Sequence, residues 1–547
     1  MKLYQVVFSF LIVVSCAEGS RLHIDVALGP PVDSQPITSN FIGFSLQIAE
    51  AINQLRLKDA GGQWQVHGAL LQMLRNLHEI SHPARSGGAI SPGPVLRLGG
   101  TSADNTCFEY PPKTEGCSYN LTISDLATYR RFAKSALERF GMNLPFVLGT
   151  NLGGAVNPKV AARLIRVLTE QHLWDAPVAL VEIGNEVDSY SETHPKSKLE
   201  TASKYANEFA EYLKEYHAAG MGQLRVQGGA FSSIARPGYD LSLKGYLQRF
   251  NNSLATISMH DYPSSRCGIM GNMGRKPVKL QELLSRFASA SQADLYRQIA
   301  KETRGSGKQL WLGELNSVGC GEDANVSDTL GSALWAVDYL SEMSKAGVTG
   351  VNFHSSFHGG SNTPCSLTSP FCLNQTSGVP DVRPLYYGLL LFTELVSNRS
   401  VWLEAAVRHK GFPLLGSNSY VHAVQDDNHI IRVAVIVKET HHDIAHLYVN
   451  VEVTRPIPNA SAWCTTATAA RLTTASGATN LTARNGILWA GMSFDNSKDG
   501  RPTGARAEDA VEVTTTTNEQ VFVFKALPAS AVLLTIRDHC HPHAWDI

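Results

Sequence analysis

The sequence predicts an α/β protein that combines a (β/α)8 TIM barrel with an accompanying antiparallel β-sandwich domain. Two observations carry this prediction. Short apolar segments alternate with amphipathic helical patterns through most of the chain, which is typical of a barrel or of an open doubly wound sheet. From about residue 396, apolar and polar residues alternate singly between turns rich in Thr, Asn and Gly, which indicates paired antiparallel strands.

Eight segments have the length and composition of buried parallel strands. They are residues 41–47, 95–100, 144–151, 178–186, 225–231, 256–262, 310–317 and 350–356. Eight is the strand number of a closed barrel, and no glycine-rich nucleotide fingerprint follows the first strand. The sequence therefore favours a catalytic barrel over residues 36–395, with the open doubly wound sheet as the alternative.

The β-sandwich domain is predicted from residues 396–547 together with residues 20–35. Alternating segments occur at 420–437, 447–453, 520–527 and 531–536. The segment "LHIDVAL" at 22–28 alternates in the same way, so we expect it to add a strand to this distant domain.

The first 19 residues are typical of a secretory signal peptide. Lys2 precedes the apolar run "VVFSFLIVV", and small residues follow it. Neither this run nor any later segment is long enough to span a bilayer, and the polar C-terminus lacks a lipid-anchor signal. We therefore expect a secreted, extracellular glycoprotein without a membrane anchor. N-glycans are expected at sequons, which occur at Asn120, Asn251, Asn325, Asn374, Asn398, Asn459 and Asn480.

Net charge argues against a nucleic-acid partner. Formal charge is -1 at pH 7, whereas proteins that bind polyanions usually carry a basic surplus. The segment "HCHPH" at 539–543 contains metal-ligand residue types, but in a secreted chain Cys540 is expected to be oxidised. The sequence thus predicts neither a metal nor another cofactor.

The cysteines predict disulfides, because eight remain after the signal is removed. Cys107 and Cys117 fall in one loop after the second strand, and Cys365 and Cys372 in one loop after the eighth, so each pair is expected to be local. Cys464 and Cys540 are expected to staple the sandwich. Cys267 and Cys320 follow neighbouring strands, the sixth and the seventh, so a bridge between their loops is predicted.

Candidate functional residues are found at the carboxyl ends of the barrel strands, where barrel enzymes place their sites. The strand ends carry Gln47, Arg97 with Gly99 and Gly100, Asn151, Asn185 with Glu186, His260 with Tyr262, Glu314, and His354. Glu186 follows the fourth strand and Glu314 the seventh. A single glutamate at a strand end is often a surface cap or an ion-pair partner, but two opposed carboxylates are what glycoside hydrolysis requires.

Four motifs in order, "LRLGGT", "EIGNEVD", "MHDYP" and "WLGELNS", resemble glycoside hydrolase family 79, the heparanase and β-glucuronidase group of clan A. The resemblance covers most of the chain. It implies a retaining mechanism, with Glu186 as acid/base, Glu314 as nucleophile, and about 5–5.5 Å between the carboxylates. It further implies that Asn185 contacts the sugar 2-hydroxyl and that Tyr262 lies beside the nucleophile.

Other positions that match the family's sugar site are Gly100 and Thr101, whose backbone lines it, and Cys320 and Gly321, whose amides would bind the glucuronate carboxylate. We add Gln47, His260 and His354 as candidate substrate-binding residues from their strand ends. Gln47 stands where the family places an acid, and Gly319 where it often has a tyrosine. The segment between Gln47 and Val95 is compact, so one uncut chain is expected.

The expected activity is that of a secreted exo-acting β-glucuronidase, which releases glucuronic acid or its 4-O-methyl form from glycans. A clan-A enzyme of other specificity is the alternative, namely a xylosidase, an arabinofuranosidase or a heparanase-like endo-β-glucuronidase. A catalytically dead carbohydrate-binding barrel is a third possibility. Because such relatives usually lose one carboxylate and this chain keeps Glu186 and Glu314, the sequence favours an enzyme with a carbohydrate substrate.

Overall fold

The structure is a computed structural model, and the predicted signal segment 1–19 lies outside the residues that it describes. Described are residues 22–32, 35–82, 90–108, 117–152, 158–170, 178–190, 201–220, 225–233, 242–266, 277–358, 365–410, 418–439, 448–457, 465–477 and 480–538.

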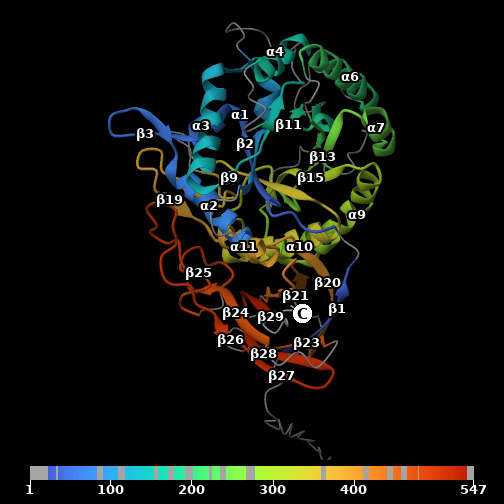
Figure 1. Ribbon diagram of the computed structural model, residues 1–547. Coiled ribbons are helices and arrows are strands. Elements are labelled where there is room, and N and C mark those ends of the chain that lie inside the picture. Colours follow the sequence, from blue (N-terminus) through green and yellow to red (C-terminus); the bar gives the residue numbers. More distant parts are fainter. Residues whose placement is uncertain are drawn as a thin grey trace, which may run out of the picture.

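Eight strands close into a barrel, as the sequence predicts (Figure 1). In barrel order they are β2 (Ile42–Gln47), β6 (Val95–Gly99), β10 (Phe146–Thr150), β11 (Val178–Ile183), β12 (Val226–Phe231), β13 (Leu254–Asp261), β15 (Gln309–Leu315) and β17 (Gly350–His354). All neighbouring pairs are parallel. Because β17 pairs with β2, the open doubly wound alternative is wrong.

Helices surround the barrel (Figure 1). They are α1 (Ile48–Gln54), α2 (Gly68–Ser81), α3 (Ile123–Phe140), α4 (Pro158–Glu170), α6 (Ala202–Ala218), α7 (Leu243–Phe250), α8 (Leu280–Leu284), α9 (Ala290–Gly305), α10 (Leu330–Lys345) and α11 (Pro384–Leu395). Local sequence sets their ends: α3 starts at a capping box of Thr122 and Asp125 and stops at Gly141, where φ is 63°. Within the described residues, no helix is long and apolar enough to cross a membrane.

The loops contain short strands and 3-10 turns. They are β3 (Arg56–Lys58), β4 (Trp64–Val66), β5 (Ser91–Pro92), β7 (Thr106–Phe108), β8 (Tyr119–Leu121), β9 (Met142–Asn143), β14 (Ser264–Ser265), β16 (Val318–Gly319), β18 (Phe371–Leu373), β19 (Pro380–Val382) and the 3-10 turns η1 (Thr101–Asn105), η3 (Val187–Ser189) and η4 (Arg286–Ala288). The predicted disulfides Cys107–Cys117 and Cys365–Cys372 are confirmed. Cys267, Cys464 and Cys540 lie outside the described residues, while Cys320 is disulfide-bonded.

A second sheet of eleven strands forms the sandwich. Its strands are β1 (His23–Pro31), β20 (Val401–Lys410), β21 (Ser419–Gln425), β22 (Ile431–Val437), β23 (Val449–Pro456), β24 (Thr465–Thr474), β25 (Ile487–Trp489), β26 (Asp509–Ala510), β27 (Glu512–Thr515), β28 (Glu519–Ala526) and β29 (Ser530–Asp538). Strand β20 pairs with β21 through Val401 and Trp402 and with β1 through residues 403–410. The sheet is therefore folded, and β20 belongs to both layers.

The N-terminal strand β1 joins this sheet, far from the next segment of the chain (Figure 1, blue among orange and red strands). It pairs antiparallel with β20 but parallel with β23, so the otherwise antiparallel sheet contains one parallel pair. A buried apolar cluster from both layers fills the space between them, including Ile24, Val433 and Phe522.

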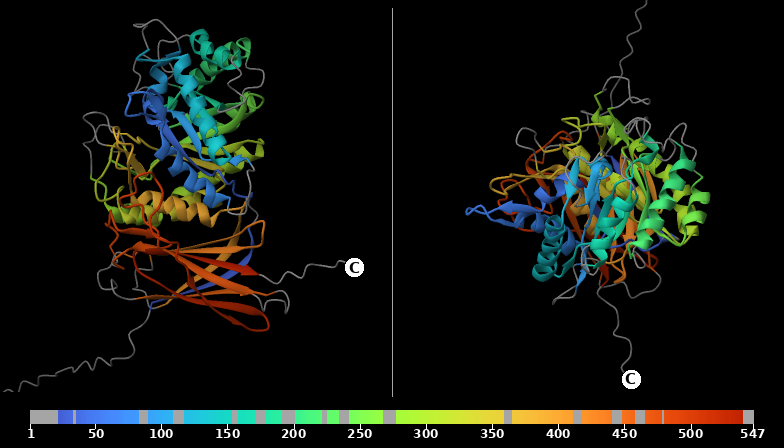
Figure 2. Two further views of the ribbon diagram at one scale, coloured as in Figure 1. Left: turned by 60° about the vertical axis from the view of Figure 1, so that its left-hand side comes forward. Right: turned by 90° about the horizontal axis from the view of Figure 1, so that it is seen from above.

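Helices α10 and α11 lie between the barrel and the sheet (Figure 2). Almost every residue of α10 is buried, because one side faces the barrel and the other faces the sandwich. Trp402, Ile436 and Leu533 of the sheet belong to the same apolar cluster as the barrel strands. One continuous core therefore joins the two parts.

A buried ion network crosses this junction. Asp338 of α10 is fully buried and accepts hydrogen bonds from Lys438 Nζ at 2.6 Å and from His422 Nε2 at 2.8 Å. Burial alone raises the pKa of Asp338, but Lys438 and His422 outweigh burial and hold that pKa well below its usual range. The carboxylate is thus a charged link between helix and sheet.

Removing Lys438 should destabilise the protein strongly. Lys438→Ala leaves Asp338 without its cation, and removal of one partner from a buried ion pair costs about 3–5 kcal/mol of unfolding free energy. The control is Lys410→Ala, because Lys410 is 66% exposed and pairs with Asp25 at 2.5 Å; such pairs contribute about 1 kcal/mol or less. Urea denaturation of both variants checks the difference, and equal losses would contradict it.

Candidate active site

A buried arginine lies at the centre of the carboxyl end of the barrel. Arg97 on β6 is 0% exposed. Its guanidinium donates to Glu182 at 2.8 Å, to Glu314 at 2.9 Å, to Ser45 at 2.8 Å and to Asn185 at 2.7 Å. Burial alone would lower the pKa of Arg97, but the two carboxylates raise it. One permanent cation thus orders groups from β2, β11 and β15.

The Arg97 network continues into the barrel interior. Glu182 also accepts a hydrogen bond from Gln227 Nε2 at 2.6 Å, and Gln227 accepts one from Thr256 at 3.1 Å. Interiors of such barrels are usually filled by branched apolar side chains. Here Arg97, Glu182, Gln227 and Thr256 form one hydrogen-bonded chain instead, so the buried charges have partners.

Glu186 has an unusual backbone conformation. Its φ is 49°, and Gly184 and Ala230 also have positive φ. The Glu186 N–H donates to the Ala230 carbonyl at 2.7 Å, which ties the end of β11 to the end of β12. A left-handed non-glycine residue costs on the order of 1–3 kcal/mol and tends to occur at functional sites. The turn presents the Glu186 side chain, 26% exposed, to the mouth of the barrel.

His260 contacts Glu186 from β13, two strands along the barrel from β11. Its Nδ1 lies 2.8 Å from Glu186 Oε1. Burial lowers the pKa of His260, but Glu314 and Glu186 together raise it above its usual value. The histidine therefore holds a proton readily and can share it with Glu186.

Glu314 has a different environment. It accepts a 2.8 Å hydrogen bond from Tyr262, and His354 Nδ1 lies 3.6 Å from its other oxygen. Burial on its own raises the pKa of Glu314, but His354, His260, Arg97 and Tyr262 outweigh it and hold that pKa well below its usual range. Glu314 is therefore ionised over the whole physiological pH range.

The two predicted acids lie close together. One carboxylate oxygen of Glu186 and one of Glu314 are within 4.8 Å of each other, and His260 completes this group. In inverting glycosidases the two carboxyl groups are about 6.5–9.5 Å apart, while in retaining ones they are about 5–5.5 Å apart. The upper bound of 4.8 Å between these two oxygens favours the retaining range over the inverting one.

A cavity of about 860 Å³ opens above these groups. Seven of the nine predicted substrate-binding residues line it, namely Gln47, Thr101, His260, Tyr262, Cys320, Gly321 and His354. Asn185 and Gly100 lie behind the wall. Asn185 is 3% exposed, with its side-chain oxygen held by Arg97. Gly100, at φ 70°, packs against Gln47, whose amide group would lie within 2.7 Å of a Cβ there.

Gln47, which stands where an acid was expected from the family resemblance, has a structural contact. Its Oε1 accepts a hydrogen bond from the Ser102 N–H at 3.0 Å, at the start of the η1 turn. The Gln47 amide therefore supports the backbone that carries Thr101 into the cavity.

The loops after β13 and β15 are joined side by side, as their neighbouring strands predict. Strands β14 and β16 pair, and the Arg266 N–H donates to the Gly319 carbonyl at 3.1 Å. The Arg266 guanidinium bonds the Glu322 carbonyl and lies 3.6 Å from Asp323. Cys320 and Gly321 both have positive φ, 58° and 122°. This clamp fixes the peptide groups that the resemblance implies as carboxylate donors.

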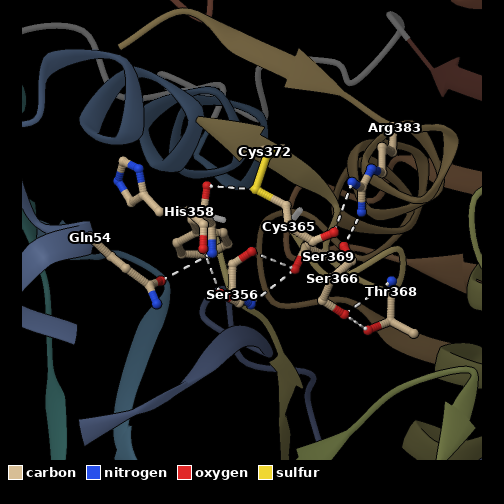
Figure 3. The surroundings of a disulfide bond; sticks show 10 residues. Gln54, Ser356, His358, Cys365, Ser366, Thr368, Ser369, Cys372 and Arg383 are labelled. Carbon is tan, nitrogen blue, oxygen red and sulfur yellow. Dashed lines mark hydrogen bonds between the residues drawn. A yellow bond between two sulfur atoms is a disulfide. The ribbon is translucent and has the colours of Figure 1, made fainter. Parts of the chain in front are cut away.

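The loop after β17 contributes two hydroxyl groups that the sequence analysis missed. Ser366 and Thr368 line the cavity, and their hydroxyls are 2.7 Å apart. Figure 3 shows what holds this loop: the Cys365–Cys372 disulfide and the Arg383 guanidinium, which donates to the carbonyls of Cys365 and Ser366. The sequence holds one signal for them: both hydroxyl residues lie between two cysteines that are close in sequence, in a loop after a barrel strand.

Two tyrosines that follow this loop do not belong to the cavity wall. Tyr386 donates to the Met73 carbonyl at 2.7 Å, and the Phe494 N–H donates to the Tyr387 hydroxyl at 2.7 Å. Both tyrosines belong to α11, and both side chains are buried.

The sequence analysis places Arg97 at its strand end but gives it no partner. A charged residue inside an apolar strand is itself a signal of a buried ion pair.

Three groups of side chains among the described residues have the spacing of metal ligands: His23 with Asp25 and Glu452, Glu186 with His260 and Glu314, and Asp338 with Glu342 and His422. In each group a cation already neutralises one acid. The pairs are Lys410–Asp25 at 2.5 Å, Arg97–Glu314 at 2.9 Å and Lys438–Asp338 at 2.6 Å. This arrangement favours ion pairs over a bound metal.

Comparison with known proteins gives a consistent class. The chain is 23% identical over 442 residues to a β-glucuronidase of Aspergillus niger, which covers 76% of this chain and 75% of the relative. Its fold is similar to a 4-O-α-L-rhamnosyl-β-D-glucuronidase from Fusarium oxysporum 12S, with TM-score 0.66, 16% identity and coverage of 93% of this chain and 100% of that one.

A family 51 α-L-arabinofuranosidase from Thermotoga petrophila RKU-1 is also similar, with TM-score 0.60, 13% identity and coverage of 94% and 100%. No protein-family model matches the chain. The class of protein that homology defines is a glycoside hydrolase, and its fold is shared with family 51 arabinofuranosidases and the rhamnosyl-glucuronidase. Within that class the chain is a homologue of a fungal β-glucuronidase, and membership of family 79 stays a prediction.

Arg97→Lys tests the role of the buried guanidinium in stability. A lysine keeps the charge but cannot serve Glu182, Glu314 and Asn185 together. Each buried polar group left without a partner costs about 1–3 kcal/mol. We therefore expect urea denaturation to show an unfolding free energy lower by about 2 kcal/mol or more. Arg501→Lys, at an exposed pair with Asp499, is the control. A loss as small as that of the control would show that the network is dispensable.

Proposed function

We propose that the protein is a secreted retaining β-glucuronidase, exo-acting, that releases glucuronic acid or its 4-O-methyl form from glycans. The observation that supports this most is the pair of acids at the barrel mouth, with oxygens within 4.8 Å, in two different environments. One acid, Glu314, is held ionised by cations. The other, Glu186, is hydrogen-bonded to His260. Such a division is what a nucleophile and an acid/base residue need.

In the proposed first step the Glu314 carboxylate attacks the anomeric carbon. The bond from that carbon to the glycosidic oxygen breaks as Glu186 gives its proton to the leaving oxygen, and a covalent glycosyl-enzyme remains. In the second step Glu186 takes a proton from water. The water oxygen attacks the anomeric carbon and releases the Glu314 carboxylate. His260, 2.8 Å from Glu186, is placed to donate to that carboxylate whenever it is ionised.

Neighbouring groups support binding of the sugar. Arg97 occupies the side-chain oxygen of Asn185, so the amide N–H remains to donate to the 2-hydroxyl, which we propose as its role. Tyr262 orients Glu314 through its 2.8 Å hydrogen bond. We assign Gln47 and Thr101 to the wall beside the sugar, and Gly100 to the turn behind that wall.

Preference for glucuronate is supported by homology to the Aspergillus niger β-glucuronidase and by likeness to the rhamnosyl-glucuronidase fold. In this proposal the substrate carboxylate is met by the amides of Cys320 and Gly321 and by His354. Those backbone positions are fixed by the paired loops and by the disulfide of Cys320.

The second candidate is a clan-A glycosidase for a neutral sugar, such as an α-L-arabinofuranosidase. Two observations favour it. Family 51 arabinofuranosidases share the fold, and none of the cavity-lining residues in the described part of the chain is Lys or Arg. A neutral sugar would need only the hydroxyl and amide groups that dominate the wall.

Secretion and glycosylation remain part of the proposal. Five of the described sequon asparagines are exposed to solvent, as glycan attachment requires, namely Asn120, Asn251, Asn325, Asn374 and Asn480. Asn398 is half-buried, and Asn459 lies outside the described residues. Local disulfides such as Cys365–Cys372 agree with an oxidising compartment.

Substitution of each acid tests its proposed role. Glu314→Gln should abolish turnover of every substrate, by about 10³-fold or more, because no nucleophile remains. Glu186→Gln should be as severe on glycans but should partly spare aryl glycosides with very good leaving groups, because their first step needs little protonation while the second step still lacks its base. Rates on a dinitrophenyl and a methyl glycoside measure the contrast. Near-normal activity of Glu314→Gln would refute the nucleophile assignment.

A substrate panel tests specificity and stereochemistry. With nitrophenyl β-glucuronide, β-xyloside and α-arabinofuranoside, we expect kcat/KM to favour the glucuronide by about tenfold or more, because a site built for a carboxylate leaves its donors unpaired with a neutral sugar. Proton NMR of the first product should show the β-anomer. Preference for the arabinofuranoside would establish the second candidate instead, and an α-anomer from the glucuronide would contradict retention.

A further inference from the structure

A buried acid separates the two residues that contact the catalytic carboxylates. Asp261 stands between His260 and Tyr262 at the end of β13. Side chains of a strand alternate between its faces, so Asp261 is directed away from its neighbours. Its carboxylate accepts hydrogen bonds from Tyr339 of α10 at 2.5 Å and from Gln292 of α9 at 2.5 Å.

A third donor binds both the side chain and the backbone of this strand. The Tyr296 hydroxyl on α9 lies 3.1 Å from Asp261 Oδ1 and 3.0 Å from the His260 carbonyl oxygen. Asp261 is 5% exposed. Helices α9 and α10 thus both bind the end of β13 through the Asp261 carboxylate.

We propose that Asp261 is a positioning residue, which fixes the end of β13 so that its two neighbours reach the catalytic acids. His260 must stay 2.8 Å from Glu186, and Tyr262 must stay 2.8 Å from Glu314. A shift of the strand end by about 1 Å would lengthen both contacts, and misplacement on that scale lowers rates by up to about 10²-fold. The inference rests on the proposed glycosidase reaction.

The arrangement is specific to an ionised carboxylate. The groups that face Asp261 are all neutral donors, Tyr339 from α10 and Gln292 and Tyr296 from α9, while His260 and Tyr262 flank it on its own strand. A carboxylate can accept from all three donors at once, whereas a protonated acid or an amide must also donate. No lysine or arginine of the described residues bonds it, so geometry rather than a salt bridge defines the contact.

Protonation of Asp261 falls in an accessible pH range. Burial raises the pKa of Asp261 to about 6, against the opposing hydrogen bonds from Tyr339, Gln292 and Tyr296. Above that pH the group is ionised and accepts all three bonds. Below it, the wild-type side chain is neutral and resembles an asparagine. Any effect of losing the charge should therefore be largest above pH 6 and fade below it.

Asp261→Asn tests this role against a matched buried acid. The control is Asp338→Asn, because Asp338 is fully buried and hydrogen-bonded but lies at the sandwich junction. Both variants should melt at lower temperature. Only Asp261→Asn should lower kcat per folded enzyme, by about tenfold at pH 7, with KM nearly unchanged. The wild-type to variant ratio of kcat should approach one as pH falls below 6.

Two results would overturn the proposal. One is a fall in melting temperature with unchanged kcat, as for Asp338→Asn, because Asp261 would then serve stability alone. The other is a raised KM with unchanged kcat. Asp261 also lines the cavity, so that outcome would make it a substrate contact.

A second variant and a structural measurement keep the test decisive if Asp261→Asn does not fold. Tyr339→Phe removes one donor and keeps the carboxylate, so a smaller fall in kcat is expected, and an unchanged kcat counts against the role. A crystal structure of either variant should show the His260–Glu186 contact beyond 2.8 Å. That distance decides the inference even if the wild type hydrolyses no glycoside, which would refute the proposed function alone.

Discussion

The carboxyl end of the barrel depends on one buried cation. Arg97 has no exposed surface, and its planar guanidinium donates to two carboxylates, a hydroxyl and an amide from three other strands. A buried arginine without acceptors would be prohibitively unfavourable, and so would Glu182 or Glu314 without a cation. The strands therefore stay in register with one another at this level. Arg97 fixes the positions of the groups around the cavity before any ligand arrives.

The same cation divides the labour between the two acids. Glu314 is hydrogen-bonded by Arg97 and Tyr262 and lies near two histidines. These groups hold its pKa well below the usual range, so it is ionised at physiological pH. Glu186 is near Glu314 but is not bonded to Arg97. It contacts His260 instead, on a backbone with φ 49°. Chemically identical side chains thus acquire different hydrogen-bond partners from their strands of origin, as a two-carboxylate mechanism requires.

The sequence predicts the barrel and its two acids because both depend on patterns along the chain. Eight apolar segments give the strands, and the ends of the fourth and seventh give Glu186 and Glu314. Contacts between strands leave no such pattern. Nothing near Arg97 in sequence indicates Glu182 or Glu314, 85 and 217 residues away. Asp261 meets α9 and α10 only after folding, and Trp402 of β20 donates to Ser344 at the end of α10, 58 residues away.

Under the proposed function, specificity depends on the loops around the cavity rather than on the Arg97 centre. With no Lys or Arg among the described residues of the cavity wall, a substrate carboxylate would be met by backbone N–H groups, hydroxyls and His354. Such neutral donors bind an anion well only when they are held in place beforehand. The β14–β16 pairing, the disulfide of Cys320, and Arg383 on the loop of Ser366 supply that rigidity. Under the proposed function, preference for an acidic sugar over a neutral one therefore depends on how rigidly these two loops are held.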